Sequence, residues 1–178
     1  MIYGIRTLTL LKELGCETHL ILSEAGKVNI EIETSHTVES VTALADYVYD
    51  NTNLAAALAS GSFLTDGMIV APCTIKTLSG IANSFTANLL VRAADVTLKE
   101  KRKLVLMIRE TPLHLGHLRL MTLAAEMGAH ILPPIPSFYH QPKTIEDIID
   151  QTVGKIFDYL GLAHDLFRRW DGSKGLKS

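Results

Sequence analysis

Apolar residues along the chain form short continuous runs that alternate with longer amphipathic stretches. The runs at residues 18–22 (THLIL), 68–71 (MIVA) and 104–108 (LVLMI) contain no acidic or basic side chain apart from His19, as is typical of strands covered on both faces of a parallel sheet. The spacing of apolar residues between these runs predicts helices over residues 2–14, 78–85, 87–100 and 113–127. This alternation predicts an α/β fold with three layers, in which a mainly parallel sheet lies between helices.

Four other segments give weaker patterns. Residues 37–49 begin with a typical N-cap, Thr37, and predict a helix. Residues 27–34 (KVNIEIET) alternate as a strand does, although they could equally begin a helix. Residues 130–136 (HILPPIP) predict the last strand, and a capping-box pattern predicts a final helix over residues 144–160.

The composition fits a globular protein. The 178 residues, 47% of them hydrophobic, are enough for one α/β domain over residues 1–170, with a flexible tail rich in Gly, Ser and Lys over residues 171–178. Seventeen basic and 19 acidic residues leave a formal charge of -2, so no overall field favours nucleic acid or an anionic membrane as a partner. Cys16 and Cys73 lack the spacing of a zinc or redox motif, and no apolar run reaches the roughly 20 residues that span a bilayer. A cytoplasmic protein with free thiols is expected.

Candidate ligand-binding residues follow the predicted strands. After the run 68–71, Thr74, Lys76 and Thr77 stand where a loop would lead into a helix, and the free N–H groups of a helix N-terminus suit an anion such as phosphate. Arg109 and Glu110 follow the run 104–108. In open α/β sheets ligands collect at the carboxyl ends of strands. These residues are therefore predicted to share one site.

Three further features allow a structural and a functional interpretation. Ser23 follows the first predicted strand, where it could contact a ligand or cap the next helix. Arg92 and Lys99 are seven residues apart on one helix face; they form either a solvated charge ladder or a pair of cations directed at an anionic ligand. His114 and His117 have a spacing that suits a metal, but no third ligand is evident, so no metal site is predicted.

Longer motifs give the chain a recognisable family pattern. The sequences PCTIKTLSGI, NLLVRAADVTLKEKRKLVLMIRETPLHLGHLRLM and LPPIPSFYHQP resemble flavin prenyltransferases of the UbiX type. That family includes proteins named as phenolic acid decarboxylase subunits, and it belongs to the flavin-binding cysteine-decarboxylase-like group of Rossmann/flavodoxin-like folds. The resemblance extends over nearly the whole chain.

The resemblance implies a metal-independent transferase. Reduced FMN would be alkylated at N5 and C6 by a dimethylallyl group from dimethylallyl monophosphate, and the prenylated FMN would pass to a UbiD-type decarboxylase as its cofactor. The resemblance also implies a homo-oligomer, commonly a dodecamer, with sites at subunit junctions. Neither the composition nor the spacing of residues indicates this number independently.

The resemblance also assigns residues to roles. The positions that match FMN contacts are Ser23, Thr74, Ile75, Lys76, Thr77 and Arg109. Tyr139 and Lys155 match contacts to the prenyl phosphate. The remaining charged residues of the implied active site are Glu33, Arg92, Lys99 and Glu110. Among these, Glu110 is the expected proton shuttle, Glu33 is expected to orient the cations, and Arg92, Lys99 and Lys155 would stabilise the departing phosphate.

The sequence departs from the family pattern in three places. The family begins with a strand and a turn of the form GASGA, and this chain starts immediately after them, so a sheet without its first strand is expected. Thr74 stands where serine is usual and keeps the hydroxyl. Lys155 stands where arginine is usual and keeps the charge, but it gives up bidentate phosphate geometry.

Two alternatives to prenyl transfer follow from the same sequence. One is direct decarboxylation of a phenolic acid, which is disfavoured because Cys73 follows a buried strand without an evident activating base. The other is a truncated, non-catalytic chain that binds flavin weakly or only joins an oligomer. The expected absence of the first strand motivates this second alternative.

Overall fold

The structure is a computed structural model that describes residues 1–170 and 172. The chain divides into two compact units, Met1–Pro134 and a second that begins at Ile135. The sequence predicted one domain over residues 1–170, and this stays a prediction. Apart from Gly172, the tail expected over residues 171–178 lies outside the described residues.

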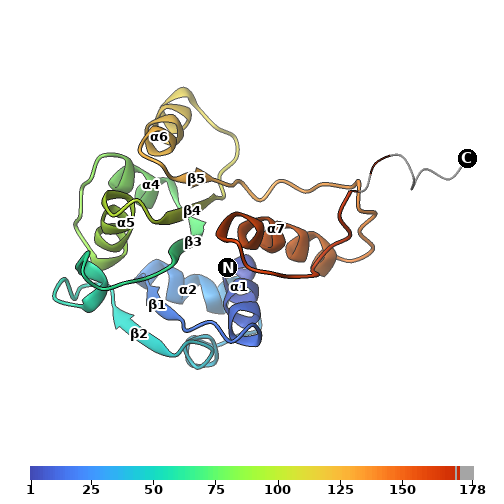
Figure 1. Cartoon of the computed structure of the whole chain (residues 1–178), viewed down its shortest axis with the longest axis horizontal. Coiled ribbons are helices and arrows are strands. Elements are labelled where there is room, and N and C mark those ends of the chain that lie inside the picture. The colour runs from blue at the N-terminus through green and yellow to red at the C-terminus, as the bar shows by residue number, and fades with distance from the viewer. Residues whose placement is uncertain (171, 173–178) are drawn as a thin grey trace, which may run out of the picture. The chain divides into compact units, whose positions relative to one another are not determined.

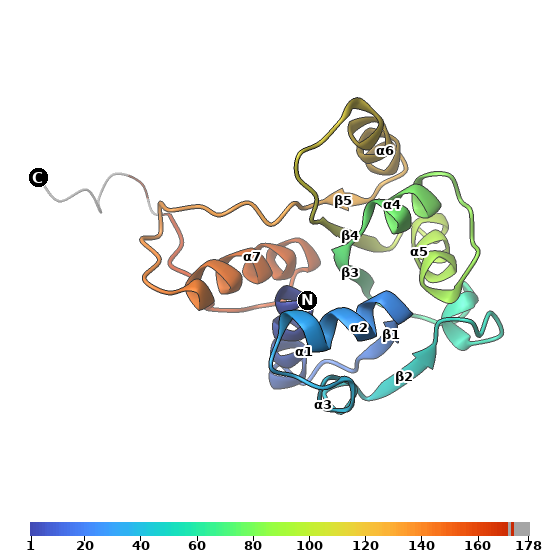
Figure 2. The same ribbon diagram turned by 180° about the vertical axis from the view of Figure 1, so that it is seen from behind.

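The first unit contains two separate parallel sheets flanked by helices (Figures 1 and 2). One sheet pairs β1 (His19–Leu22) with β2 (Tyr47–Asp50), and the other has the order β3 (Gly67–Cys73), β4 (Lys103–Ile108), β5 (His130–Ile131). The helices of this unit are α1 (Ile2–Glu13), α2 (Glu24–Glu33), α3 (Val38–Thr42), α4 (Ile75–Ala82), α5 (Leu89–Lys99) and α6 (Leu115–Glu126), with a short 3-10 helix, η1 (Ala57–Ala59). The predicted α/β fold with parallel strands between helices is confirmed.

The core of the three-stranded sheet is built around β4. Residues 104–108 are at most 2% exposed, as expected for a strand covered on both faces. Leu104, Leu106 and Ile108 alternate toward one side, where they join buried residues of α4, α5 and α6. These three helices consequently cover one face of this sheet (Figure 1).

The two-stranded sheet has a smaller core, and hydrogen bonds between Thr18 and Asp46 join its strands at their start. Ile5 and Leu8 of α1 pack with Ile30 of α2 and Val41 of α3. At the start of both strands, the Thr18 backbone N–H and hydroxyl donate to Asp46 Oδ2 at 2.8 and 2.9 Å. These bonds hold the pKa of Asp46 below its ordinary value, chiefly through the Thr18 N–H. The bonds join the two residues that directly precede His19 and Tyr47, the first pair of the parallel ladder.

Several predicted elements differ from those observed. The helix expected over residues 37–49 ends at Thr42, and residues 47–49 belong to the strand β2. Residues 27–34 continue α2 instead of forming a strand, and the last strand is limited to residues 130–131. β3 continues through Pro72 to Cys73, two residues beyond the predicted apolar run.

The second unit contains α7 (Ile145–Leu160), which begins with the predicted capping box. Thr144 Oγ1 accepts from the Asp147 N–H, and Asp147 accepts in return from the Thr144 N–H. Ile149 and Ile156 are 6% and 0% exposed, whereas Ile145 is 72% exposed. Gly161 ends the helix with φ 84°, a left-handed conformation that glycine adopts without strain.

Replacing Leu106 by alanine is expected to destabilise the first unit by about 2–5 kcal/mol, because the leucine is fully buried and its loss leaves a cavity. The matched control is Leu64→Ala, at a side chain that is 81% exposed, where a change within about 0.5 kcal/mol is expected. Urea unfolding of the two variants measures both effects. Equal losses at the two positions would contradict the assigned core.

Candidate active site

The N-terminus of α4 lies directly after β3 and forms the centre of the candidate site. Thr74 is the N-cap of this helix, and its Oγ1 accepts from the Thr77 N–H at 3.3 Å. Thr74 and Lys76 are exposed, whereas Ile75 and Thr77 are half-buried. The helix therefore presents its first turn, with its positive end and a hydroxyl, at the edge of the sheet.

The pairing of β3 with β4 brings the second group of predicted residues to the same edge. Cys73 is the partner of Ile108 in the parallel ladder, so the chain leaves both strands side by side. The next residues are Thr74 after β3, and Arg109 with Glu110 after β4; all three are exposed. Glu110 Oε1 also accepts from the Thr111 N–H at 3.2 Å. The structure thus places a cation and a carboxylate beside a helix N-terminus.

Ser23 and Glu33 belong to α2, beside the two-stranded sheet. Ser23 caps this helix, with its Oγ accepting from the Gly26 N–H at 3.1 Å, which is the structural role that its sequence position allowed. Glu33 is the last residue of α2, and its Oε2 lies 2.5 Å from the Met1 α-amino group. Their predicted roles toward flavin and the cations stay predictions.

Arg92 and Lys99 lie on α5 and contact other groups of the first unit. Arg92 donates from Nε to the Ala59 carbonyl at 3.1 Å and from NH1 to Asp95 Oδ2 at 3.4 Å. Lys99 pairs with Glu100, its Nζ lying 2.5 Å from Oε1. The side chains of Arg92 and Lys99 are 36% and 52% exposed.

Lys99 and Arg109 lie at opposite ends of β4. Lys99 precedes the first residue of β4 by four positions, while Arg109 follows the last residue of that strand. The six residues of β4 span roughly 15–20 Å. One chain therefore does not bring Lys99 next to Glu110.

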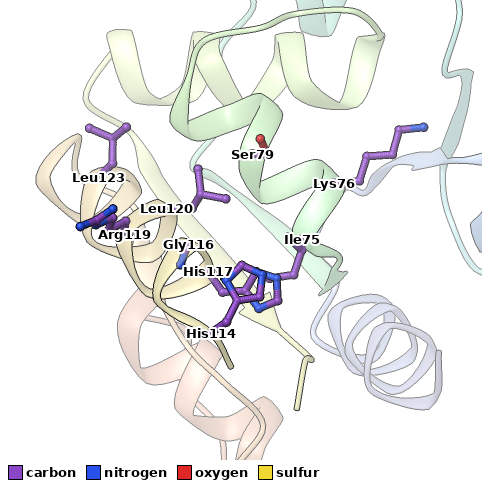
Figure 3. Close-up of a pocket in the computed structure, with 9 residues that line it drawn as sticks. All are labelled: Ile75, Lys76, Ser79, His114, Gly116, His117, Arg119, Leu120 and Leu123. Atoms are coloured by element: carbon purple, nitrogen blue, oxygen red, sulfur yellow. Dashed lines mark hydrogen bonds between the residues drawn. The ribbon is translucent and has the colours of Figure 1, made fainter. Parts of the chain in front are cut away.

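A hollow of about 490 Å³ between α4 and α6 adjoins the candidate site (Figure 3). The rings of His114 and His117 lie against each other there, with centroids 3.6 Å apart, and Figure 3 shows them beside Ile75 while Lys76 extends away. His117 Nδ1 is buried and has no hydrogen-bond partner. Sequence analysis considered these histidines only as two metal ligands without a third, and it did not predict that they line this hollow.

No group of three or more His, Cys, Asp or Glu side chains that could hold a metal ion occurs among the described residues. Within the same part of the chain, none of the helices is both long enough and apolar enough to cross a bilayer.

The two residues predicted to contact the prenyl phosphate are in the second unit. Tyr139 precedes α7 and accepts a hydrogen bond from Gln151 Nε2 at 3.2 Å. Lys155 is on α7, with its Nζ 3.8 Å from Asp158 Oδ2. Sequence reasoning did not single out Gln151 or Asp158, because neither belongs to a motif and both gain their roles only from the way this unit folds.

Cys73 is unsuited to act as a nucleophile. The side chain is 1% exposed, and burial raises the pKa of its thiol to about 12. A thiol rather than a thiolate is therefore present at neutral pH, and only the thiolate is reactive. This observation agrees with the expectation that the protein does not decarboxylate a phenolic acid directly through Cys73.

In the folded protein, Cys73 is expected to resist iodoacetamide at pH 8.5, whereas the half-buried Cys16 is alkylated. Peptide mass spectrometry after labelling measures both sites. Labelling in urea is the control, because unfolding should make the two cysteines equally reactive. Rapid alkylation of Cys73 in the native protein would contradict the assigned burial.

Comparison with known proteins identifies the family. The model of the family described as Flavoprotein matches residues 1–157. The chain is 58% identical over 173 residues to flavin prenyltransferase UbiX of Thauera aromatica, covering 97% of this chain and 89% of the relative. It is 54% identical over 175 residues to the UbiX of Escherichia coli strain K12, covering 97% and 93%.

Two solved structures share the fold at high identity. A complex of AnUbiX (PadA1) with FMN and dimethylallyl pyrophosphate has a TM-score of 0.95 at 47% identity and covers 97% of this chain and 92% of that one. A dodecameric FMN-dependent Ubix-like decarboxylase from Escherichia coli O157:H7 has a TM-score of 0.93 at 46% identity, with coverage of 96% and 93%. From its sequence and its fold alike, this chain belongs to the UbiX family of flavin prenyltransferases.

Proposed function

We propose that this protein transfers a dimethylallyl group from dimethylallyl monophosphate to reduced FMN, at N5 and C6. The prenylated FMN would then serve a UbiD-type decarboxylase as its cofactor. The observation that carries the proposal is the identity of 54–58% to UbiX flavin prenyltransferases over 97% of the chain. The complex of AnUbiX with FMN and dimethylallyl pyrophosphate, at 47% identity, supports the same pair of substrates.

The edge of the β3–β4 sheet fits the flavin. The first turn of α4 can donate backbone N–H groups, and Thr74 adds a hydroxyl, while Arg109 adds positive charge. These groups suit the phosphate and the polar ring atoms of FMN. Ser23, Ile75, Lys76 and Thr77 complete the proposed contacts. When bound, reduced FMN supplies the nucleophilic ring positions for the reaction.

The charged side chains have separate proposed roles at the prenyl donor. Breaking the bond between the allylic carbon and the phosphate oxygen leaves both electrons on the phosphate, so fixed cations lower the barrier. We assign this task to Arg92, Lys99 and Lys155, with Tyr139 donating from its hydroxyl. Glu110 transfers a proton at the exposed strand edge, and Glu33 orients the cations.

The separation of Lys99 from Glu110 supports a site that is shared between copies of the chain. Because β4 keeps these residues apart in one chain, Lys99 would reach Glu110 from a neighbouring subunit. The helix α6 also presents an apolar side to solvent, with Leu115 and Leu118 60% and 47% exposed. The dodecameric relative at 46% identity supports a homo-oligomer, which we propose to be a dodecamer.

We also propose that the protein works in the cytoplasm. Cys16 and Cys73 are free thiols. A reducing compartment keeps both thiols in this form, and reduced FMN needs the same conditions.

The variant Glu110→Gln is expected to lower kcat about 100-fold to 10,000-fold, because the amide cannot carry a proton, while the affinity for FMN changes little. Glu126→Gln, at an exposed carboxylate that ends α6, is the matched control and should retain full activity. The assay incubates protein, reduced FMN and dimethylallyl monophosphate anaerobically and measures the mass of the flavin product.

The same assay tests the proposed function itself. Wild-type protein should add one dimethylallyl unit to FMN, and parallel reactions with the monophosphate and the pyrophosphate identify the preferred donor. A flavin mass that stays unchanged with both donors would contradict prenyl transfer. Loss of carbon dioxide from a phenolic acid without added decarboxylase would support the alternative, since one relative is described as a decarboxylase.

A further inference from the structure

The segment after α7 folds back onto this helix within the second unit. Phe167 is 9% exposed, and the His164 side chain is 3% exposed. The contact depends on Gly154, because a Cβ at this position would lie 2.5 Å from Phe167 Cε1 and 2.8 Å from His164 Cε1. Residues 164–169 are therefore held against the face of α7 that carries Gly154.

Asp158 joins this segment to Lys155. Arg169 donates to both carboxylate oxygens of Asp158, from NH2 to Oδ1 at 2.7 Å and from NH1 to Oδ2 at 3.1 Å. Lys155 Nζ lies 3.8 Å from the same Oδ2. The ammonium and the guanidinium thus share one oxygen atom and lie close to each other.

The aromatic ring of Phe167 contacts both cations. Lys155 Nζ is 5.1 Å from the ring centroid, and Arg169 Cζ is 5.5 Å from it. Such cation–π contacts restrict two long side chains that would otherwise be mobile. The side chains of Lys155 and Arg169 remain 47% and 58% exposed, so their charged groups stay accessible to a ligand.

The charges around Asp158 leave Lys155 and Arg169 available to bind an anion. His164 Nδ1 accepts from the Leu166 N–H at 3.3 Å, and its Nε2 lies 3.0 Å from Asp158 Oδ1 and 3.3 Å from Arg169 NH2. The Asp158 carboxylate faces both Lys155 and Arg169. The exposed Asp165 also attracts Arg169.

Tyr139 lies within electrostatic range of the same guanidinium. The pKa of Arg169 is raised, chiefly by its hydrogen bonds to Asp158 and in smaller part by Asp165 and Tyr139. The Tyr139 hydroxyl is in turn held by Gln151. Arg169 and Lys155 therefore share the Asp158 carboxylate within the unit that also contains Tyr139. Lys155 and Tyr139 are the two residues already assigned to the prenyl phosphate.

We propose that Arg169 is a further phosphate-binding residue, which binds the phosphate of the prenyl donor together with Lys155. This inference rests on the proposed function. A lysine offers a point charge, whereas a guanidinium can donate two parallel hydrogen bonds to a phosphate. Arg169 NH1 and NH2 both donate to Asp158, and NH2 also lies 3.3 Å from His164 Nε2. Two of its five N–H groups then remain for a ligand, on a side chain that is 58% exposed. Asp158, Phe167 and Gly154 hold it in place.

Calorimetric titration of the full-length chain with dimethylallyl monophosphate tests the proposal. Arg169→Gln is expected to raise the dissociation constant about 10-fold to 100-fold, because hydrogen bonds between charged groups are lost, and Arg169→Lys should retain part of the affinity. Arg168→Gln is the matched control at the exposed neighbouring arginine and should bind within about twofold of the wild type. The affinity for FMN should be the same in all three variants.

A double-mutant cycle with Lys155→Gln separates ligand binding from a structural role. Two cations on one phosphate should give losses in donor affinity that are not additive. Equal donor binding by Arg169→Gln and wild type, or an equal loss of FMN affinity in Arg169→Gln, would overturn this inference alone. A wild-type chain that binds the donor but forms no prenylated FMN would overturn the proposed function and leave the binding role of Arg169 standing.

Discussion

The parallel pairing of β3 with β4 is the constraint on which the candidate site depends. The two strands pair from Gly67 opposite Lys103 to Cys73 opposite Ile108, with one irregularity between Val70 and Cys73, and residues 104–108 of β4 are buried throughout. Because Cys73 and Ile108 are partners at the ends of the two strands, Thr74 and Arg109 must emerge side by side. The apolar core thereby positions the polar groups of the sheet edge.

The sequence predicted the parts of the fold in which the pattern and the environment agree. The uncharged run 104–108 is a buried strand because both of its faces are covered. The helix expected over residues 37–49 was wrong at its end, because Tyr47, Val48 and Tyr49 have aromatic or β-branched side chains that suit the edge strand paired with β1. Helical spacing in a short segment could not reveal that partner strand.

The candidate site was predictable to a similar degree. Thr74, Arg109 and Glu110 could be found because each comes within three residues of the end of an apolar run, and position at a strand end is a local signal. The cluster around Asp158 could not be found in this way, since it depends on a chain reversal that brings Arg169 back to a residue eleven positions earlier. The alternation of strands and helices carries no information about such a contact.

The central claim is that the exposed edge formed by Thr74, Arg109 and Glu110 binds the flavin. A crystal structure of this protein with FMN would test it most directly. The account predicts that FMN lies at the N-terminus of α4, with Arg109 in contact with the flavin. FMN bound elsewhere, such as in the hollow lined by His114 and His117 with no contact to Thr74 or Arg109, would contradict the account.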